Sequence, residues 1–279
     1  MRVRAAISPD PDDLFMFRAI IEGLVDTGGL EFTVETADTD ALNRMASGDG
    51  ADINAISIAH YPRVAHAYLL SRHGASVGRG YGPVVVELAG SAERPLPGLR
   101  IAVPGTTTTA YLVLRALVGE FEPVVVPIVP YARTFEALRR GEVDAALLIH
   151  EGRLTFADEG CVARLDIGEA WAERTGLPLP LGGNVIRRGL GRDTVELVDR
   201  VVRDSIAHAL SDREAAMDWL AARGVALRDR DRLDRYLAMY ANADTLDMGD
   251  DGVKGVQAVL DTGTALGLFA PTRAEFARA

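Results

Sequence analysis

The sequence RIAVPGTTTTAYLVLRALV, residues 100–118, places a strand, a turn and a helix in immediate succession. The apolar run 100–103 predicts the strand, and 110–118 predicts the helix; this succession is the basic unit of an α/β protein. The first N–H groups of a helix lack internal partners and carry the positive end of its dipole. The turn therefore predicts a carboxylate or phosphate site, with Thr108 and Thr109 against the ligand. A plain helix cap explains the same threonines.

Similar strand and helix signals alternate on both sides of this stretch. They predict an α/β protein of two lobes joined by two hinge crossovers, with the ligand in the cleft at the carboxyl ends of the strands. The Gly-, Ser- and Pro-containing segment 89–98 predicts the first crossover, and 177–188 predicts the second. Lobe I would comprise residues 1–89 and 186–279, and lobe II residues 90–185. Hinged lobes of this kind close over their ligands.

The composition is that of an ordinary globular protein, with 279 residues, 48% hydrophobic and 25% charged. A net charge of −10 argues against a nucleic-acid partner, because phosphate binding needs a concentrated basic surface. No apolar run is long enough to span a membrane, and the opening MRVRAAISPDPDD does not resemble an export signal. We therefore expect a cytoplasmic protein without membrane or nucleic-acid partners, as a monomer or homodimer. The single cysteine, Cys161, is expected in the core.

Three further positions are candidates for the cleft. The acidic turn SPDPDD, residues 8–13, follows the predicted strand 3–7, so Ser8, Asp10 and Asp13 could face the ligand. Helix capping and solvation explain clustered aspartates as well, and we predict no metal site. Ser57 follows the apolar run 53–56 and is expected to cap a helix that runs to about residue 70.

His150 is the strongest candidate for acid–base chemistry. It ends the apolar run AALLIH, 145–150, where a strand would reach the cleft. An imidazole has a pKa suited to taking a proton near neutral pH. The other four histidines do not form a zinc-like cluster in the sequence, and no other catalytic motif stands out.

Seven segments, in order along nearly the whole chain, resemble the MqnA/MqnD family of menaquinone biosynthesis, and within it the 1,4-dihydroxy-6-naphthoate synthases. Each segment alone would be a weak signal, but their order makes a strong one. They are SPDPDD with Phe15 and Phe17, ALNR at 41–44, GASVGRGYGPVVV at 74–86, AVPGTTTTAY at 102–111, GEVDAALLIHEGRLTF at 141–156, TGLPLPLGG at 175–183 and YANADTLDMGDDG at 240–252.

The resemblance implies a type II periplasmic-binding-protein fold and a carbon–carbon lyase that needs no cofactor. The family's substrate is cyclic dehypoxanthinyl futalosine, a small-molecule carboxylate, and its product is 1,4-dihydroxy-6-naphthoate. The family's histidine base falls on His150, and its paired threonines fall on Thr108 and Thr109. Its substrate-binding stretch falls on Ala55, Ile56 and Ser57.

Two departures from the family's pattern leave alternatives open. The family usually reads SPCPND, so a neutral Cys and Asn become Asp10 and Asp12 here, and a lysine often found two residues before the serine is Ala55. Both changes make the predicted cleft more negative and leave room for a different substrate. The rival interpretations are a chorismate dehydratase of the same family, which should lack the His150 arrangement, and a non-catalytic solute-binding protein for a small carboxylate.

Overall fold

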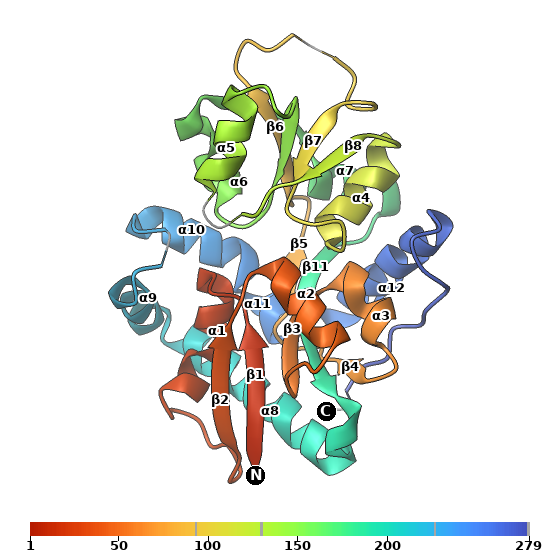
Figure 1. Cartoon of the computed structure of the whole chain (residues 1–279). Coiled ribbons are helices and arrows are strands. Elements are labelled where there is room, and N and C mark those ends of the chain that lie inside the picture. The colour runs from red at the N-terminus through yellow and green to blue at the C-terminus, as the bar shows by residue number, and fades with distance from the viewer. Residues whose placement is uncertain (93, 129–130, 226, 278–279) are drawn as a thin grey trace.

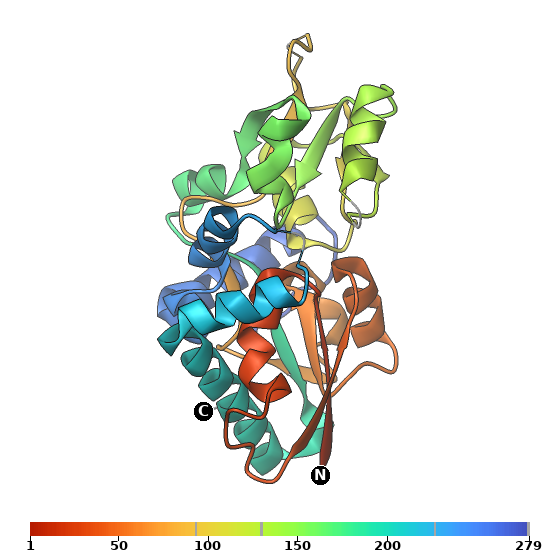
Figure 2. The same cartoon turned by 90° about the vertical axis from the view of Figure 1, so that its left-hand side faces the viewer.

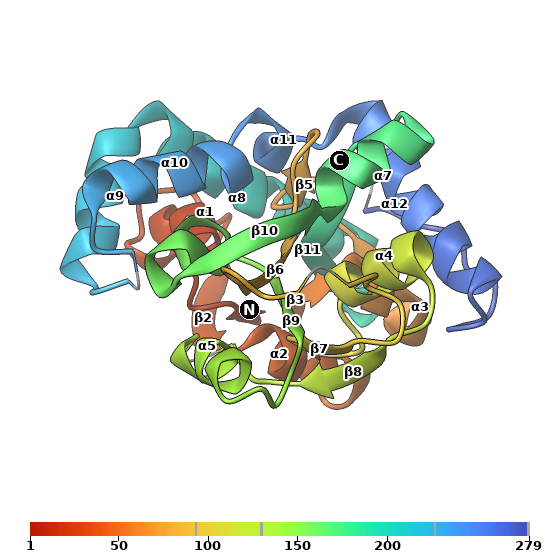
Figure 3. The ribbon, with the colours of Figure 1, turned by 90° about the horizontal axis from the view of Figure 1, so that it is seen from above.

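The computed structural model describes residues 1–92, 94–128, 131–225 and 227–277. Two β-sheets lie one above the other, each flanked by helices, with the chain passing between them near the middle of the molecule (Figure 1). The two further views show helices on both faces of the lower sheet and helices between the levels of the two sheets (Figures 2 and 3). The predicted α/β class is confirmed.

The first sheet has six strands in the order β2-β1-β3-β11-β4, with β5 pairing β11 as well. β1 pairs in parallel with β2 and β3, whereas β11 runs antiparallel to its neighbours. The strands are β1 (Arg2–Ile7), β2 (Glu31–Thr36), β3 (Ile53–Ser57), β4 (Tyr68–Leu70), β5 (Ser76–Gly78) and β11 (Leu179–Arg187).

The second sheet has five strands in the order β10-β6-β9-β7-β8. β7 pairs in parallel with β8 and β9, and β6 runs antiparallel to both β9 and β10. The strands are β6 (Val84–Leu88), β7 (Arg100–Val103), β8 (Glu122–Val125), β9 (Ala145–Leu148) and β10 (Cys161–Asp166).

Helices follow the strands and carry the chain back. The first part of the chain contains α1 (Pro11–Ile21), α2 (Thr39–Ser47), the 3-10 turn η1 (Ile58–His60) and α3 (Tyr61–Val64). The middle contains α4 (Thr109–Val118), α5 (Ala132–Arg139), α6 (Gly152–Thr155), η2 (Phe156–Glu159) and α7 (Ile167–Thr175). The last part contains η3 (Arg188–Leu190), α8 (Arg192–Ser211), α9 (Arg213–Ala222), α10 (Arg230–Tyr240), α11 (Ala243–Leu246) and α12 (Gly249–Ala265).

The β7–turn–α4 unit forms as the sequence predicts, and its ends have local causes. Thr108 has extended backbone angles, and its hydroxyl accepts a hydrogen bond from the Tyr111 N–H at 3.2 Å, which caps α4. Gly119 ends the helix with a positive φ of 83°, where a side chain would be strained. Between these ends Leu112, Val113 and Leu114 are buried, so the helix is fixed by packing as well as by its caps.

One apolar core joins elements of both sheets. It contains Ile56 and Tyr61 from the first sheet's side, Ile101 from β7, Trp171 from α7 and Val259 from α12. Burial of such side chains contributes about 1.5–3 kcal/mol each. The contact of α4 with α12 and η1 therefore helps to hold the two halves of the molecule together.

The sheet pairing differs from the predicted crossovers. β6, which the prediction assigned to the first lobe, pairs with β9 and β10 in the second sheet. The chain therefore crosses at residues 79–83, between β5 and β6, and segment 89–98 leads from β6 to β7 within the second sheet; residue 93 lies outside the described residues. On the return β11 already pairs with β5 at Leu179, ahead of the predicted boundary at 185/186.

One predicted helix boundary is wrong. The helix expected from Ser57 to about residue 70 ends at Val64, because residues 68–70 pair with β11 as β4. α1 begins at Pro11, since proline is well suited to the first position of a helix. Cys161 is buried as expected, and within the described residues no helix is both long and apolar enough to cross a membrane.

Candidate functional site

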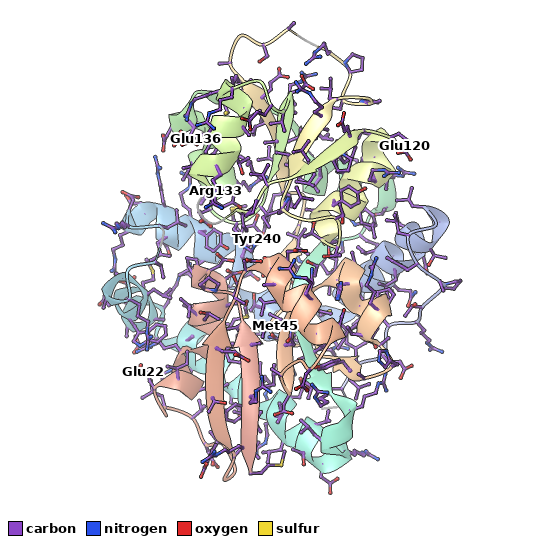
Figure 4. All side chains as sticks on the ribbon, in the orientation of Figure 1. Glu22, Met45, Glu120, Arg133, Glu136 and Tyr240 are labelled. Carbon is purple, nitrogen blue, oxygen red and sulfur yellow. The ribbon has the colours of Figure 1, made fainter. Side chains whose placement is uncertain are left out.

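A cavity that opens to solvent lies between the two sheets, with about 770 Å³ of space that includes part of the open solvent. Tyr240, which lines it, marks its level in Figure 4. The carboxyl ends of β1, β3, β7 and β9 lead into its walls, as expected for an α/β protein. The sequence-predicted residues that line the cavity are Ser8, Asp13, Ala55, Ile56, Ser57, Thr108, Thr109 and His150.

The cavity has no strongly basic side chain in its described lining, which contains neither lysine nor arginine. Two groups of its lining matter most for a ligand. Thr108, Thr109 and Ala110 at the start of α4 form the first, called here the α4 end, and the acidic turn after β1 together with His150 forms the second, the acidic end; Ser57, Ser76 and Tyr240 are further polar residues of the lining. An anion in this cavity would therefore find its partners at the helix N-terminus or at His150.

At the α4 end, both predicted threonines already use their hydroxyls. Thr108 Oγ1 donates to the Gly105 carbonyl at 2.9 Å while it caps Tyr111. Thr109 Oγ1 donates to the Leu181 carbonyl at 2.6 Å and accepts from the Ala59 N–H at 3.1 Å, so it joins α4 to β11 and η1. The hydroxyls thus fix the helix start, and the groups left to bind an anion are the first-turn N–H groups of Thr109 and Ala110.

Ser57 does not cap a helix with its side chain, contrary to the prediction. Its backbone N–H donates to Asn43 Oδ1 at 3.0 Å, and its hydroxyl accepts from Asn43 Nδ2 at 3.2 Å. The same Nδ2 donates to Thr107 Oγ1 at 3.0 Å. Asn43, from α2, thus links the end of β3 to the turn before α4.

At the acidic end, each of the three aspartates has its own partners. Asp10 lies at the N-cap position of α1 but makes no capping hydrogen bond with its side chain. Asp12 is buried and accepts from Tyr236 Oη and Ser76 Oγ, both at 2.9 Å. Asp13 Oδ2 accepts from the Ser8 N–H at 2.6 Å. Ser8 also donates its hydroxyl to Asp10, so the turn after β1 is held by its own side chains.

His150 follows the end of β9 in an unusual backbone conformation. Its φ of 47° is the one positive value at a non-glycine residue among those described, and such conformations persist where the surroundings enforce them. The Tyr131 hydroxyl donates to the preceding carbonyl of Ile149 at 2.5 Å. A side chain at Gly152 would collide with the Tyr131 ring, because its Cβ would lie 2.8 Å from the ring. Tyr131 and Gly152 therefore fix the turn that presents His150.

The imidazole of His150 touches three different segments. Nδ1 lies 3.3 Å from Asp10 Oδ2 and 3.3 Å from Tyr236 Oη. Nε2 lies 3.3 Å from Oγ1 of Thr39, the first residue of α2. Asp10 is not among the cavity-lining residues, whereas Thr39 and His150 are. The ring therefore presents Nε2 on the cavity side and Nδ1 to groups behind it.

The acids around His150 change each other's pKa and that of the imidazole. Burial raises the pKa of Asp12 and, more strongly, that of Asp13, and neighbouring aspartates add to both effects. Burial alone would lower the pKa of His150, but the carboxylates of Asp10, Asp12, Glu151 and Asp13 together raise it above the usual value. His60 provides the contrast, because burial and Arg63 lower its pKa to about 4.

Asp10, Asp12 and His150 also bring one possible ligand atom each within 4.8 Å of one another. These atoms already have protein partners, since Ser8 donates to Asp10 and Asp12 accepts from Tyr236 and Ser76. The arrangement is therefore satisfied internally, and we assign it no metal ion.

Several residues in or beside the cavity were not identified as site candidates from the sequence. Thr39 lies outside the segments that carried the family resemblance, and Asn43 lies in one of them, ALNR at 41–44, without having been a candidate. Tyr236 comes from α10, 86 residues from His150, and no local signal connects the two. The described lining also includes Ser76, Leu181, Gly182, Gly183 and Tyr240, which fall within segments that carried the family resemblance.

Comparison with known proteins identifies the family of the chain. The sequence profile of a family described as menaquinone biosynthesis matches residues 3–265. A Thermus thermophilus protein named 1,4-dihydroxy-6-naphthoate synthase is 40% identical, with 97% of each chain covered. A Streptomyces coelicolor protein of the same name is 35% identical, with 95% of this chain and 94% of that one covered.

Solved structures show the same fold. A crystal structure of an Archaeoglobus fulgidus protein superposes with a TM-score of 0.88 at 41% identity, covering 96% of this chain and 98% of that one. The alkanesulfonate-binding protein SsuA from Xanthomonas axonopodis has a TM-score of 0.69 at 16% identity, covering 99% and 96%, and it shares the fold alone. The predicted periplasmic-binding-protein fold is confirmed, and the chain belongs to the menaquinone biosynthesis family.

Proposed function

We propose that this protein is a 1,4-dihydroxy-6-naphthoate synthase, which cleaves cyclic dehypoxanthinyl futalosine to 1,4-dihydroxy-6-naphthoate. The names of the relatives at 40% and 35% identity support this activity. The observation that carries the proposal is that His150 and the N-terminus of α4 line the same cavity. A substrate that carries both a carboxylate and an acidic C–H can meet both groups there.

The α4 end would hold the substrate carboxylate. The free N–H groups of its first turn point out of the helix start and can donate two hydrogen bonds to an anion. Thr108 and Thr109 fix the helix start through their backbone partners. Ala55, Ile56 and Ser57, at the end of β3, would form the wall against the sugar-derived ring.

The His150 end would remove the proton. Nε2 is the nitrogen on the cavity side, and a neutral imidazole takes a proton there as a general base. The electrons of the broken C–H bond then pass into the second ring, the carbon–carbon bond breaks, and the released sugar-derived fragment leaves with the electrons of that bond and takes up a proton. The second ring becomes aromatic, which supplies much of the driving force. We propose that this lyase reaction needs neither a metal nor an organic cofactor, and that closure of the lobes orients the base and excludes water.

A direct turnover assay tests this function. The purified protein is incubated with cyclic dehypoxanthinyl futalosine, and the product is identified by mass; parallel samples contain chorismate or a chelator. We expect 1,4-dihydroxy-6-naphthoate from the first substrate, no reaction with chorismate and no effect of the chelator. Conversion of chorismate instead would assign the chain to the dehydratase branch of the family. Tight binding of the futalosine derivative without turnover would refute the enzyme and favour a solute-binding role. We place the enzyme in the cytoplasm, in keeping with the biosynthetic names of its relatives.

A further inference from the structure

Asp10 occupies the N-cap position of α1, where an aspartate normally caps the helix with its side chain. The N-cap residue of a helix usually accepts a hydrogen bond from the second or third N–H of the first turn. Asp38 does so for α2, as does Asp229 for α10. Asp10 has the extended backbone of an N-cap, yet its side chain makes no such bond. Its Oδ2 instead lies 3.3 Å from His150 Nδ1.

A second contact indicates which nitrogen of His150 carries the proton. The Tyr236 hydroxyl has one proton, and it donates this to Asp12 Oδ1 at 2.9 Å. Toward His150 Nδ1, at 3.3 Å, the same oxygen can therefore only accept. A carboxylate oxygen and an accepting hydroxyl both face Nδ1, so the proton of the neutral imidazole belongs on Nδ1 and the lone pair on Nε2.

From these contacts we infer that Asp10 is a positioning residue for His150: its carboxylate, at ion-pair distance from Nδ1, favours the proton on that nitrogen and keeps Nε2 unprotonated toward the cavity. This inference rests on the proposed function for its catalytic consequence. Asp10 is outside the cavity lining, so it acts on the substrate only through the imidazole. The partner that binds the second ring nitrogen commonly sets which tautomer a histidine adopts.

The ionisable groups around the pocket together affect the pKa of His150. The ionisable groups that face His150 are Asp10 from the turn before α1, Asp12 and Asp13 from α1, Glu151 beside it and Tyr236 from α10. Burial disfavours the charged imidazole, and among the carboxylates that oppose this effect Asp10 raises the pKa of His150 most. Burial also raises the pKa values of Asp12, Asp13 and Glu151, so these acids hold protons more readily.

The test combines histidine NMR with a pH profile. The ring nitrogens of the five histidines are followed in the intact wild type, in Asp10→Asn and in Asp193→Asn, and His150→Ala assigns the His150 signals. Asp193→Asn removes an equal charge from an exposed position at the start of α8. The acid limb of kcat/KM for cyclic dehypoxanthinyl futalosine is measured on the same samples.

In the wild type we expect the neutral ring to be protonated on Nδ1. In Asp10→Asn the His150 titration should fall by about one pH unit or more, since a close carboxylate shifts a pKa by about 1–3. The acid limb should move down with it, because a base with a lower pKa stays unprotonated to lower pH. Asp193→Asn should change neither the His150 titration nor the acid limb of kcat/KM.

Three results would overturn the inference. The first is that Asp10→Asn has the same His150 titration and the same acid limb as the wild type. If its activity then falls equally at all pH values, Asp10 has a structural role. Another is a neutral wild-type ring protonated on Nε2, a result that does not depend on Asp10→Asn folding. A third is an enzyme whose activity a chelator abolishes, which would assign the carboxylates to a cation. If the wild type turns over no substrate, the proposed function fails, and the NMR titration alone then decides whether Asp10 binds His150.

Discussion

The two ends of the cavity are built from the same unit, a strand followed by a helix, but the residue at the helix start serves different purposes. At the β7–α4 junction Thr108 caps the helix with its hydroxyl, and the free N–H groups beyond it suit an anion. At the β1–α1 junction Asp10 occupies the same position without capping and contacts His150 instead. The side chain of Thr108 thus serves its helix, whereas the side chain of Asp10 lies against His150.

The largest effect should come from removing the base at the acidic end. We expect His150→Ala to lower the turnover rate by roughly 10²–10⁴-fold, the usual contribution of a general base, while binding of the substrate persists. Single-turnover kinetics and equilibrium binding measure the two properties separately. The matched control is His66→Ala, since His66 is exposed, and it should leave both unchanged. An equal loss in the two variants would deny His150 a special role.

At the α4 end the proposed donors are backbone N–H groups, so the test changes the ligand and not a side chain. A product analogue that lacks the carboxylate should bind about 10–100-fold more weakly than 1,4-dihydroxy-6-naphthoate, because hydrogen bonds to a charged group are worth about 1.5–3 kcal/mol. Isothermal titration calorimetry measures the ratio. Equal affinities would mean that the helix start does not hold the carboxylate.

The two junctions should also differ in stability. Thr108→Ala removes the cap of α4 and should lower the free energy of unfolding by about 1 kcal/mol, whereas Thr108→Ser keeps the hydroxyl and should lose less. Asp10→Asn removes no capping bond from α1 and should therefore cost less than Thr108→Ala. Chemical denaturation measures all three variants. A larger loss for Asp10→Asn would show that Asp10 serves its helix after all.

The smallest effect concerns Asp13 and depends on pH. Burial raises the pKa of Asp13 well above the usual value, so the folded state binds its proton more tightly than the unfolded state. The stability that this proton contributes is present below the unfolded pKa and is lost as the pH rises through the folded pKa. Asp13→Asn should therefore be more stable than the wild type at neutral pH, and the gain should disappear in acid. A gain that is independent of pH would contradict the assigned cause.

The sequence predicts the local features of the two junctions well and their tertiary contacts poorly. The α4 cap depends on residues within one turn of the helix, and the position of His150 follows from the apolar run before it. The contact between His150 and Asp10 depends on how the two sheets face each other, and Tyr236 reaches Asp12 over 224 residues of chain. The acidic turn was identified, but which of its aspartates faces His150 was not.

The wrong predictions have related causes. Gly, Ser and Pro mark any loop, so the composition of 89–98 could not distinguish a hinge crossover from a loop within one sheet. Residues 68–70 are a strand because β11 pairs with them, and tertiary pairing overrides local propensity.

The central claim is an orientation: the substrate lies with its carboxylate at the start of α4 and its acidic C–H at His150. A crystal structure of His150→Ala with cyclic dehypoxanthinyl futalosine bound tests it most directly, because the variant should bind the substrate without consuming it. We predict that the carboxylate accepts hydrogen bonds from the N–H groups of Thr109 and Ala110 and that the reacting ring lies beside the vacated His150 position. A substrate bound in the reverse direction, with its carboxylate among Asp10, Asp12 and Asp13, would contradict the account.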